Sequence, residues 1–272
     1  MVVQHNLTAM NSNRMLGVTV AQQKKSTEKL SSGYKINRAA DDAAGLAISE
    51  KMRRQIRGLT QASANAQDGI SCVQTAEGAL NEVHDMLQRL NELAVKAANG
   101  TNQSEDRQYI QLEVSALLSE INRVSETTTF NERALLDGSF SSVNLQVGAE
   151  GTSANGIKLT ISSINTAGLG IASLSVASEA SAKNAISSIK GAIKQLNLQR
   201  AQLGAVQNRL EHTINNLNNV VENTTAAESQ IRDTDMATEM VKFSNNNILA
   251  QAGQSMLAQA NQSNQGVLSL LG

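Results

Sequence analysis

The sequence predicts a mainly α-helical protein, with a long antiparallel coiled-coil rod, a small β-hairpin and paired N- and C-terminal helices. Three observations predict this fold class. Heptad-spaced apolar residues run along much of the chain, proline is absent, and aromatic residues make up only 2% of the 272 residues. Since proline breaks helices and aromatic side chains dominate globular cores, long helices with narrow aliphatic seams fit this composition best.

The N-terminal region is expected to form two helices in succession. The first starts near Leu7 and stops at Gly33, because glycine readily adopts the left-handed conformation of a helix C-cap. The second opens with Asp41 and Asp42, whose carboxylates are well placed to accept hydrogen bonds from the free N–H groups of its first turn. Arg38 is a reasonable local salt-bridge partner for these acids.

Three apolar seams predict coiled-coil helices in the middle of the chain. They run over residues 73–97, 110–124 and 182–221, with spacings that alternate between 3 and 4. The third seam carries polar residues at two of its positions, Arg200 and Gln207. Polar seam residues can specify the register of helix pairing at a cost in stability.

Residues 127–178 are richer in Gly, Ser and Thr, and their apolar residues alternate with a period of two. Two alternating runs, around residues 143–147 and 157–161, are separated by a turn at residues 148–156. This pattern predicts a β-hairpin at about residues 141–162. With helices on either side, the simplest closure is a chain that runs out, turns and returns.

Both ends of the chain are almost free of charge. Residues 243–272 contain no Asp, Glu, Lys or Arg, and Arg14 is the only such residue within 1–23. Two disordered polar tails are one explanation, and burial against other copies of the chain is the other. Burial is favoured because both ends also carry apolar residues. The residues expected to form this assembly surface are Leu7, Met10, Leu249, Ala252, Met256, Leu257, Val267, Leu268, Leu270 and Leu271.

Long runs at both ends resemble bacterial flagellin. The N-terminal run covers residues 30–48, which read LSSGYKINRAADDAAGLAI, and residues 58–70 continue the likeness. The C-terminal run covers residues 249–262, which read LAQAGQSMLAQANQ, and is followed by VLSLL at residues 267–271. The resemblance extends over roughly residues 1–140 and 180–272. One departure is Asn264, which stands where many relatives have proline.

The resemblance implies two domains. Residues 1–40 and 235–272 would form an inner domain of terminal helices, whose copies pack as a tube around the export channel. Residues 41–234 would form a helical rod domain that carries the β-hairpin. Arg38, Asp41 and Asp42 would lie at the domain junction. Because almost nothing is inserted in the middle, the filament is expected to be thin and smooth.

The resemblance also implies a function and partners. The chain would be a structural subunit that polymerises with itself into the extracellular flagellar filament for swimming motility. It would leave the cell through the flagellar type III apparatus without a cleaved signal peptide, after binding an export chaperone through its C-terminal stretch. Hook-associated junction proteins and the cap protein would contact it in the flagellum.

Residues 87–95 resemble the flagellin segment bound by the Toll-like flagellin receptor of animals. By position, Gln88, Arg89, Leu93 and Glu113 match the receptor-contacting residues. An Arg beside an exposed Leu is a frequent anchor pair in protein interfaces. The alternative is that Arg89 and Glu113 are merely charged residues that keep the surface of the rod hydrated.

The sequence argues against several other classes of protein. A net charge of −1 at pH 7 is unlike the basic footprint of a nucleic-acid binder, and no apolar run is long enough for membrane insertion. No cofactor or metal site is expected, since His5, His84 and His212 are far apart and Cys72 is the only cysteine. We therefore expect no enzyme. Two other interpretations stay open: a hook–filament junction protein, and a secreted coiled-coil adhesin or scaffold.

Overall fold

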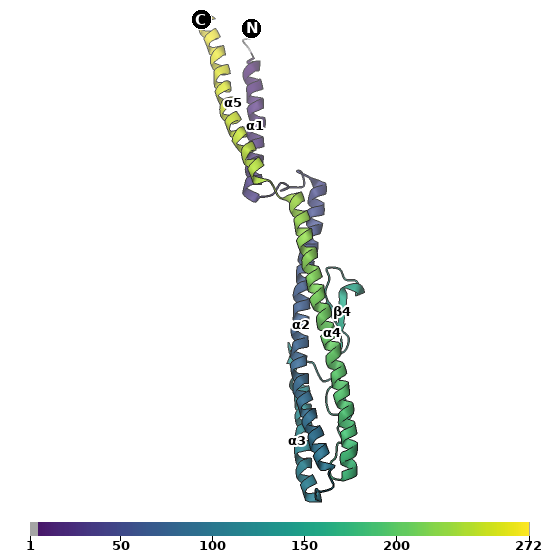
Figure 1. Ribbon diagram of the computed structural model, residues 1–272. Helices are drawn as coiled ribbons and strands as arrows, with labels where there is room; N and C mark the ends of the chain where they lie inside the picture. The colour runs from purple at the N-terminus through teal and green to yellow at the C-terminus, as the bar shows by residue number, and fades with distance from the viewer. Residues whose placement is uncertain (1–4, 272) are drawn as a thin grey trace. The chain divides into compact units, whose positions relative to one another are not determined.

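The computed structural model describes the backbone of residues 5–271 and the side chains of residues 5–263. It confirms a mainly α-helical chain with small β-hairpins (Figure 1). The chain divides into a terminal unit, Met1–Arg54 with Glu222–Gly272, and a central unit, Gln55–Val221. The elements are α1 (Leu7–Ser32), α2 (Ala43–Ala97), α3 (Ser104–Thr127), β1 (Thr129–Phe130), β2 (Arg133–Ala134), β3 (Val143–Gln146), β4 (Gly156–Leu159), α4 (Glu179–Arg232) and α5 (Met236–Leu271).

The ends of α1 follow the expected capping chemistry. The Asn6 side chain accepts a hydrogen bond of 3.0 Å from the backbone N–H of Ala9 at the start of the helix. At its other end Gly33 has a φ of 75° and donates its N–H to the Lys29 carbonyl at 2.9 Å. Only glycine adopts this left-handed conformation without a steric penalty, so the predicted stop at Gly33 is confirmed.

The predicted seam of α2 forms a large part of the core of the central unit. All eight of its residues are buried, and α3 adds Ile110, Val114 and Ile121 to the same core. Arg89 of α2 reaches Glu113 of α3, and Glu77 of α2 reaches Arg200 of α4. The seam residues of α2 are Val73, Ala76, Leu80, Val83, Leu87, Leu90, Ala94 and Ala97.

Half of the predicted seam of α4 is buried as expected, but Ala185, Ala192 and Gln199 are buried where the sequence predicts burial of the following residue. Gln199, which is 4% exposed, is the buried polar residue of this helix, whereas Arg200 and Gln207 are half-buried at its edge. The reason is that α4 packs against the segment that follows the hairpin as well as against α2. A wider strip of the surface of α4 is therefore buried than one partner helix would cover. The buried residues of α4 are Ala182, Ala185, Ile189, Ala192, Leu196, Gln199, Leu203, Leu210 and Leu217.

The expected hairpin is present, and a second one precedes it. Strands β3 and β4 pair antiparallel, with Val143 opposite Leu159 and Gln146 opposite Gly156. Strands β1 and β2 are joined through Asn131 and Glu132, whose φ values are 48° and 63°. Two successive positive φ values make a tight hairpin turn that Asn-Gly usually forms, so this turn was hard to predict from Asn-Glu.

The stretch from Thr160 to Ser178 has neither helix nor strand, yet it completes the core. Ile161, Ile164 and Ile171 are almost fully buried. Its backbone is held by side chains of the neighbouring helices, because buried N–H and C=O groups need partners. Gln199 donates from Nε2 to the Thr160 carbonyl (3.1 Å) and accepts from the Ser162 N–H (3.2 Å).

Replacing Gln199 by Leu should therefore destabilise the central unit, because it leaves two partly buried backbone groups, the Thr160 carbonyl and the Ser162 N–H, without partners. We expect a loss of about 1–3 kcal/mol per group that stays unsatisfied. Thermal unfolding followed by circular dichroism measures it. The matched control is Gln207→Leu, whose exposed hydrogen bond is to Glu211. Equal effects at both positions would contradict this role of Gln199.

Candidate functional site

Helices α1 and α5 lie side by side and antiparallel in the terminal unit (Figure 1). Near the start of α1, Asn6 donates from Nδ2 to the Ala260 carbonyl of α5 at 3.0 Å. Ser26, towards the other end of α1, donates to Glu239 near the start of α5. The two helices are therefore in contact over most of the described length of α1.

The contact between these helices is made mainly of small and polar residues. The side chains that face the partner helix are half-buried or buried and recur at spacings of 3 and 4. In α1 the only buried residue is Ser26. The facing residues are Ala9, Ser12, Leu16, Thr19, Gln23, Ser26 and Leu30 in α1, and Glu239, Phe243, Asn246, Ala250, Gly253, Leu257 and Ala260 in α5.

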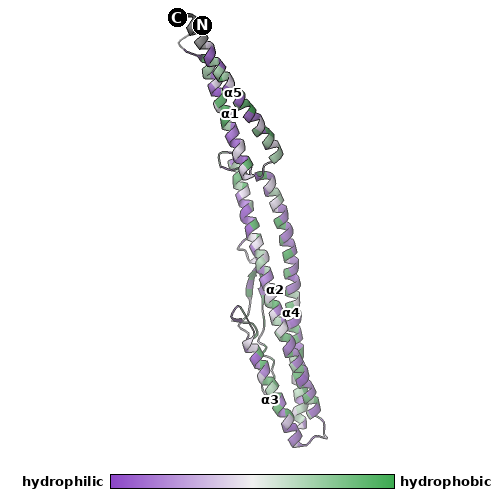
Figure 2. Ribbon diagram, turned by 90° about the vertical axis from the view of Figure 1, so that its left-hand side faces the viewer, coloured by the Kyte–Doolittle hydropathy of each residue, from purple (hydrophilic) through white to green (hydrophobic). Residues whose placement is uncertain are grey.

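Large apolar side chains instead lie on the outside of the pair. Leu7 is 67% exposed, and Ile248 and Met256 are each 62% exposed. Hydrophobic residues recur along both helices (Figure 2). A pair that places its apolar residues outward is suited to contact other molecules. We define the outward apolar face as Leu7, Met10, Met15 and Val18 of α1 with Met240, Val241, Ile248, Leu249 and Met256 of α5.

Most of the described assembly candidates lie on or beside this face. Leu249, Ala252 and Met256 line a hollow of about 350 Å³ together with Met15 and Leu16. Leu257 instead faces α1 and is half-buried. The side chains of four further candidates lie outside the described residues: Val267, Leu268, Leu270 and Leu271. The part that these ten residues play in assembly stays a prediction.

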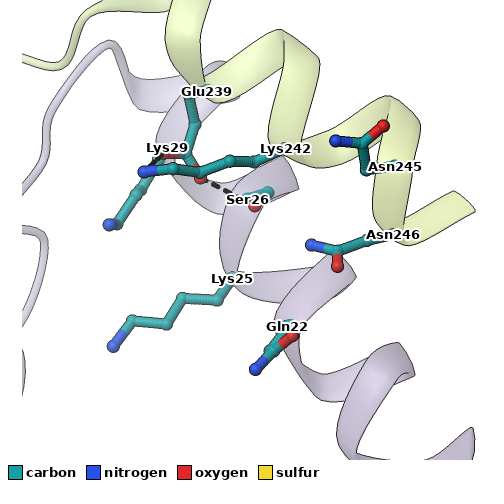
Figure 3. Close-up of a pocket in the computed structure, with 8 residues that line it drawn as sticks. All are labelled: Gln22, Lys25, Ser26, Lys29, Glu239, Lys242, Asn245 and Asn246. Carbon is teal, nitrogen blue, oxygen red and sulfur yellow. Dashed lines mark hydrogen bonds and ion pairs between the residues drawn. The ribbon is translucent and has the colours of Figure 1, made fainter. Parts of the chain in front are cut away.

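A buried carboxylate joins α1 to α5. Glu239 is 5% exposed and accepts a hydrogen bond of 2.7 Å from the Ser26 hydroxyl (Figure 3). This hydrogen bond lowers the pKa of Glu239, burial opposes the shift, and the charges of Lys29 and Lys242 add to it. Lys242 lies 3.6 Å from the second carboxylate oxygen. The group is therefore held in its ionised form.

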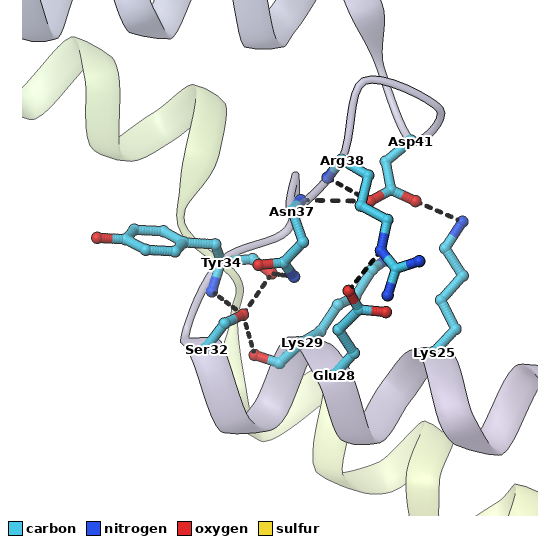
Figure 4. A network of polar contacts seen from close by, with 8 residues as sticks. All are labelled: Lys25, Glu28, Lys29, Ser32, Tyr34, Asn37, Arg38 and Asp41. Atoms are coloured by element: carbon cyan, nitrogen blue, oxygen red, sulfur yellow. Dashed lines mark hydrogen bonds and ion pairs between the residues drawn. The ribbon is translucent and has the colours of Figure 1, made fainter.

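The loop between α1 and α2 is closed by Asp41 (Figure 4). Its carboxylate accepts from the backbone N–H groups of Asn37 and Arg38 at 3.2 and 3.1 Å and pairs with Lys25 at 2.8 Å. The hydrogen bond from Lys25, followed by those from the two backbone groups, lowers the pKa of Asp41 to about 2. The loop is thus built around one ionised acid.

Asp42 and Arg38, the other two residues predicted to lie at the domain junction, have different roles. Asp42 accepts from the Gly45 N–H at 2.9 Å and so provides the N-cap of α2. The predicted side-chain pair of Arg38 with these acids is wrong, because its guanidinium binds Glu28 at 2.9 Å. The loop brings Arg38 over α1, where Glu28 is the carboxylate within reach.

Sequence analysis missed Arg232, which organises the second connection of the terminal unit. Its carbonyl accepts from the Lys35 N–H at 2.7 Å, and Tyr34 forms a short β-bridge with Asp233. Its guanidinium pairs with Glu50 at 2.6 Å and lies 4.9 Å from the centre of the Tyr34 ring. No sequence pattern indicates this cluster, because its members come from distant parts of the chain.

The four residues predicted to contact the receptor lie in two different environments in the central unit. Arg89 binds Glu113 at 2.8 Å and Glu92 at 3.0 Å while staying half-exposed, and Gln88 is exposed. Leu93 is 3% exposed, so the interpretation of an exposed Leu beside the Arg is wrong. Leu93 lies three residues after Leu90 and four before Ala97, on the buried side of α2.

The described residues offer little for other chemistry. Among them, no group of three or more His, Cys, Asp or Glu residues could hold a metal ion. Burial raises the pKa of the Cys72 thiol, which makes the reactive thiolate less available. No described helix has the length and apolar character needed to cross a membrane.

Comparisons with known proteins point to one family. A profile of the bacterial flagellin N-terminal helical region matches residues 3–141, and one of the C-terminal helical region matches residues 186–271. A flagellin of Halalkalibacterium halodurans is 54% identical over the full length of both chains. Flagellin of Bacillus subtilis and flagellin FlaB2 of Treponema pallidum are each 48% identical, also over the full length of both chains.

Solved structures share parts of the fold. The crystal structure of Bacillus cereus flagellin, 30% identical, matches with a TM-score of 0.50 over 57% of this chain and 88% of that chain. A putative flagellar hook-associated protein from Vibrio parahaemolyticus matches with a TM-score of 0.59 over 71% of this chain and all of that one. At 12% identity the second likeness shows the fold alone.

The buried Glu239 predicts an acid-sensitive contact between α1 and α5. Its pKa is lowered in the folded state, so its contribution to stability is present above the ordinary value of about 4.5 and is lost as the pH falls through the folded value. Thermal unfolding at a series of pH values should show this loss. Glu239→Gln should flatten the pH dependence, whereas Glu28→Gln, a control at the surface ion pair of α1 with Arg38, should not. An unchanged profile for Glu239→Gln would contradict the prediction.

Proposed function

This chain belongs to the bacterial flagellin family, and we propose that it polymerises into the flagellar filament through the outward apolar face of α1 and α5. As a flagellin it is a structural subunit of the extracellular flagellar filament. The observation that carries the proposal is the placement of the large apolar side chains. Most of them lie outside the helix pair, while mainly small and polar residues lie between the helices.

Folding of α1 and α5 is coupled to assembly in this proposal. The pair covers little apolar surface by itself, which is too little to offset the entropy of ordering two long helices. Neighbouring subunits supply the missing contacts, so the two helices are mobile in the monomer and ordered in the polymer. The contacts are head-to-tail, which generates an open helical polymer rather than a closed oligomer.

The domain assignment belongs to the same proposal. Residues 1–40 and 235–272 form the inner domain that lines the export channel, and residues 41–234 form the rod. The inner domain contains the two stretches that are nearly free of charge, residues 1–23 and 243–272, and this supports its assignment because copies can then pack closely without mutual repulsion.

Export and the flagellar partners follow from the family. The subunit leaves the cell through the flagellar type III apparatus. An export chaperone covers the C-terminal stretch until assembly, which suits a helix that exposes Ile248, Leu249 and Met256. At the ends of the filament the same surface meets the hook-associated junction proteins and the cap protein.

We also propose contact with the animal Toll-like flagellin receptor through Gln88, Arg89 and Glu113. Arg89 and Glu113 are oriented by their mutual ion pair and are still half-exposed, so an incoming partner can reach them. Leu93 acts indirectly in this proposal, by packing beneath the helix that presents Gln88 and Arg89.

Substitution of the outward apolar face tests the assembly proposal. The double variant Ile248→Gln, Met256→Gln should fail to form filaments under conditions in which the parent chain polymerises, because it removes apolar surface that neighbours would bury. Electron microscopy and sedimentation measure polymerisation. The matched control, Gln251→Ala with Gln254→Ala, changes exposed polar residues of the same helix.

A truncation without residues 243–272 gives a second test. It should retain the thermal transition of the central unit, whose core lies within residues 72–203, and yet not polymerise. Normal filaments from this truncation, or from the double variant, would overturn the assembly proposal.

The receptor proposal is tested with Arg89→Ala and Glu113→Ala. Each should weaken receptor activation by about tenfold or more if the pair anchors the interface, since interface anchors contribute about 2 kcal/mol or more. Glu120→Ala is the control, because it removes another exposed ion pair of α3, with Arg123. Leu93→Ala should instead lower thermal stability, by about 2–5 kcal/mol. Full activation by the Arg89 and Glu113 variants would contradict the proposal.

A further inference from the structure

The chain contains two Asn-Gly dipeptides, Asn99-Gly100 and Asn155-Gly156. In such a dipeptide the backbone nitrogen of the glycine can attack the side-chain carbonyl carbon of the asparagine. Glycine favours the reaction because it has no Cβ to shield its nitrogen and because its backbone reaches unusual conformations easily. The reaction also needs a free N–H and a backbone that can move.

Asn99 and Gly100 come closer to these conditions than the other pair does: the Gly100 N–H is free within the part of the chain that the structure describes, although the Asn99 backbone carbonyl accepts two hydrogen bonds. Both residues are exposed in the short loop that joins α2 to α3. The backbone hydrogen bonds among the described residues include none donated by Gly100. Among the described residues, the Asn99 side chain makes one hydrogen bond, and it is long: Oδ1 accepts from the Thr101 N–H at 3.4 Å. A Cβ added at Gly100 would meet nothing within 4 Å, so the space around its nitrogen is open.

Asn155 and Gly156 do not meet them. The Asn155 side chain donates from Nδ2 to the Glu150 carbonyl at 2.9 Å, and the backbone carbonyl of Asn155 accepts from the Val147 N–H at 2.8 Å. Gly156 donates its N–H to the Ser153 carbonyl and pairs with Gln146 in the β3–β4 ladder. The Gly156 nitrogen, which would be the nucleophile, thus already donates its N–H to a hydrogen bond. Both residues are also fixed by the hairpin.

We propose that Asn99 is a site of spontaneous deamidation and that the fold protects Asn155 from the same reaction. Gly100 N bonds to Asn99 Cγ while the Cγ–Nδ2 bond breaks, and the amide leaves as ammonia with the proton that Gly100 N loses. The product is a five-membered succinimide ring. Water then opens either of its two carbonyl–nitrogen bonds, which gives aspartate or isoaspartate at position 99.

Isoaspartate at position 99 changes the turn between α2 and α3. The main chain then runs through Cγ and is one carbon longer, and the backbone carbonyl that accepts from Asn102 N at 3.3 Å and from Arg107 Nη2 at 3.1 Å becomes a free carboxylate outside the main chain. Either product also places a negative charge just beyond the C-terminus of α2, where the helix dipole disfavours it and the Arg107 guanidinium attracts it, so the hydrogen bonds of Arg107 to this turn are expected to rearrange. Ageing of the protein is therefore expected to loosen this end of the α2–α3 pair.

The test follows both sites during prolonged incubation of the full-length monomer in mildly alkaline buffer. Peptide mapping by mass spectrometry detects the exchange of NH₂ for OH, and enzymatic methylation of isoaspartate identifies the product. We expect modification at residue 99 and none at residue 155 in the folded chain. In concentrated urea both sites should react at similar rates, because the hairpin no longer protects Asn155.

Gly100→Ala is the matched variant, since the structure has room for its methyl group. It should melt at the parent temperature and slow the reaction at residue 99 by about tenfold, because a Cβ restricts the backbone and shields the nitrogen. The proposal is overturned if folded protein stays unmodified at residue 99 while urea-unfolded protein reacts there, or if both sites react equally in the folded chain.

Discussion

The property on which the terminal unit depends is that its helix pair is apolar on the outside. In most helical pairs the large aliphatic side chains lie between the helices and polar residues lie outside. Here Ser26 and Glu239 are the buried residues of the contact, whereas Leu7, Ile248 and Met256 are among the most exposed. Such a pair gains little from its own association. Its stability depends on what covers the outer face, which the proposed assembly assigns to neighbouring subunits.

The central unit is built in the opposite way. Heptad residues of α2, α3 and α4 bury one another, and the irregular segment between β4 and α4 fills the remaining groove with isoleucine and leucine side chains. Polar side chains bind the backbone of that segment, as Gln199 does at Thr160 and Asn122 does at Thr166. The unit thus buries a continuous apolar core within one chain and satisfies most of its buried polar groups, with His84 Nδ1 as the exception among its described side chains.

Predictions that rested on local spacing succeeded, and those that depended on the direction of a side chain were less reliable. The α2 seam, the Gly33 cap and the β3–β4 hairpin follow from residues close together in sequence. Gln199 rather than Arg200 is buried because α4 has two neighbours, and the spacing of one helix does not reveal the second. Arg38 binds Glu28 rather than the nearer acids because the loop turns it back over α1. Leu93 is buried for a similar reason, since the side of α2 that α3 and α4 cover is wider than one seam.

By itself, the sequence determined the helical class, the positions of the main helices and the family, because periodicity, capping residues and long ordered matches are local properties of the chain. It also determined that the ends are uncharged. Only the tertiary structure decided which residues face outward from α1 and α5, and which polar groups are buried among the helices. Those outcomes depend on the rotation of each helix about its axis, which is settled by all of its neighbours together.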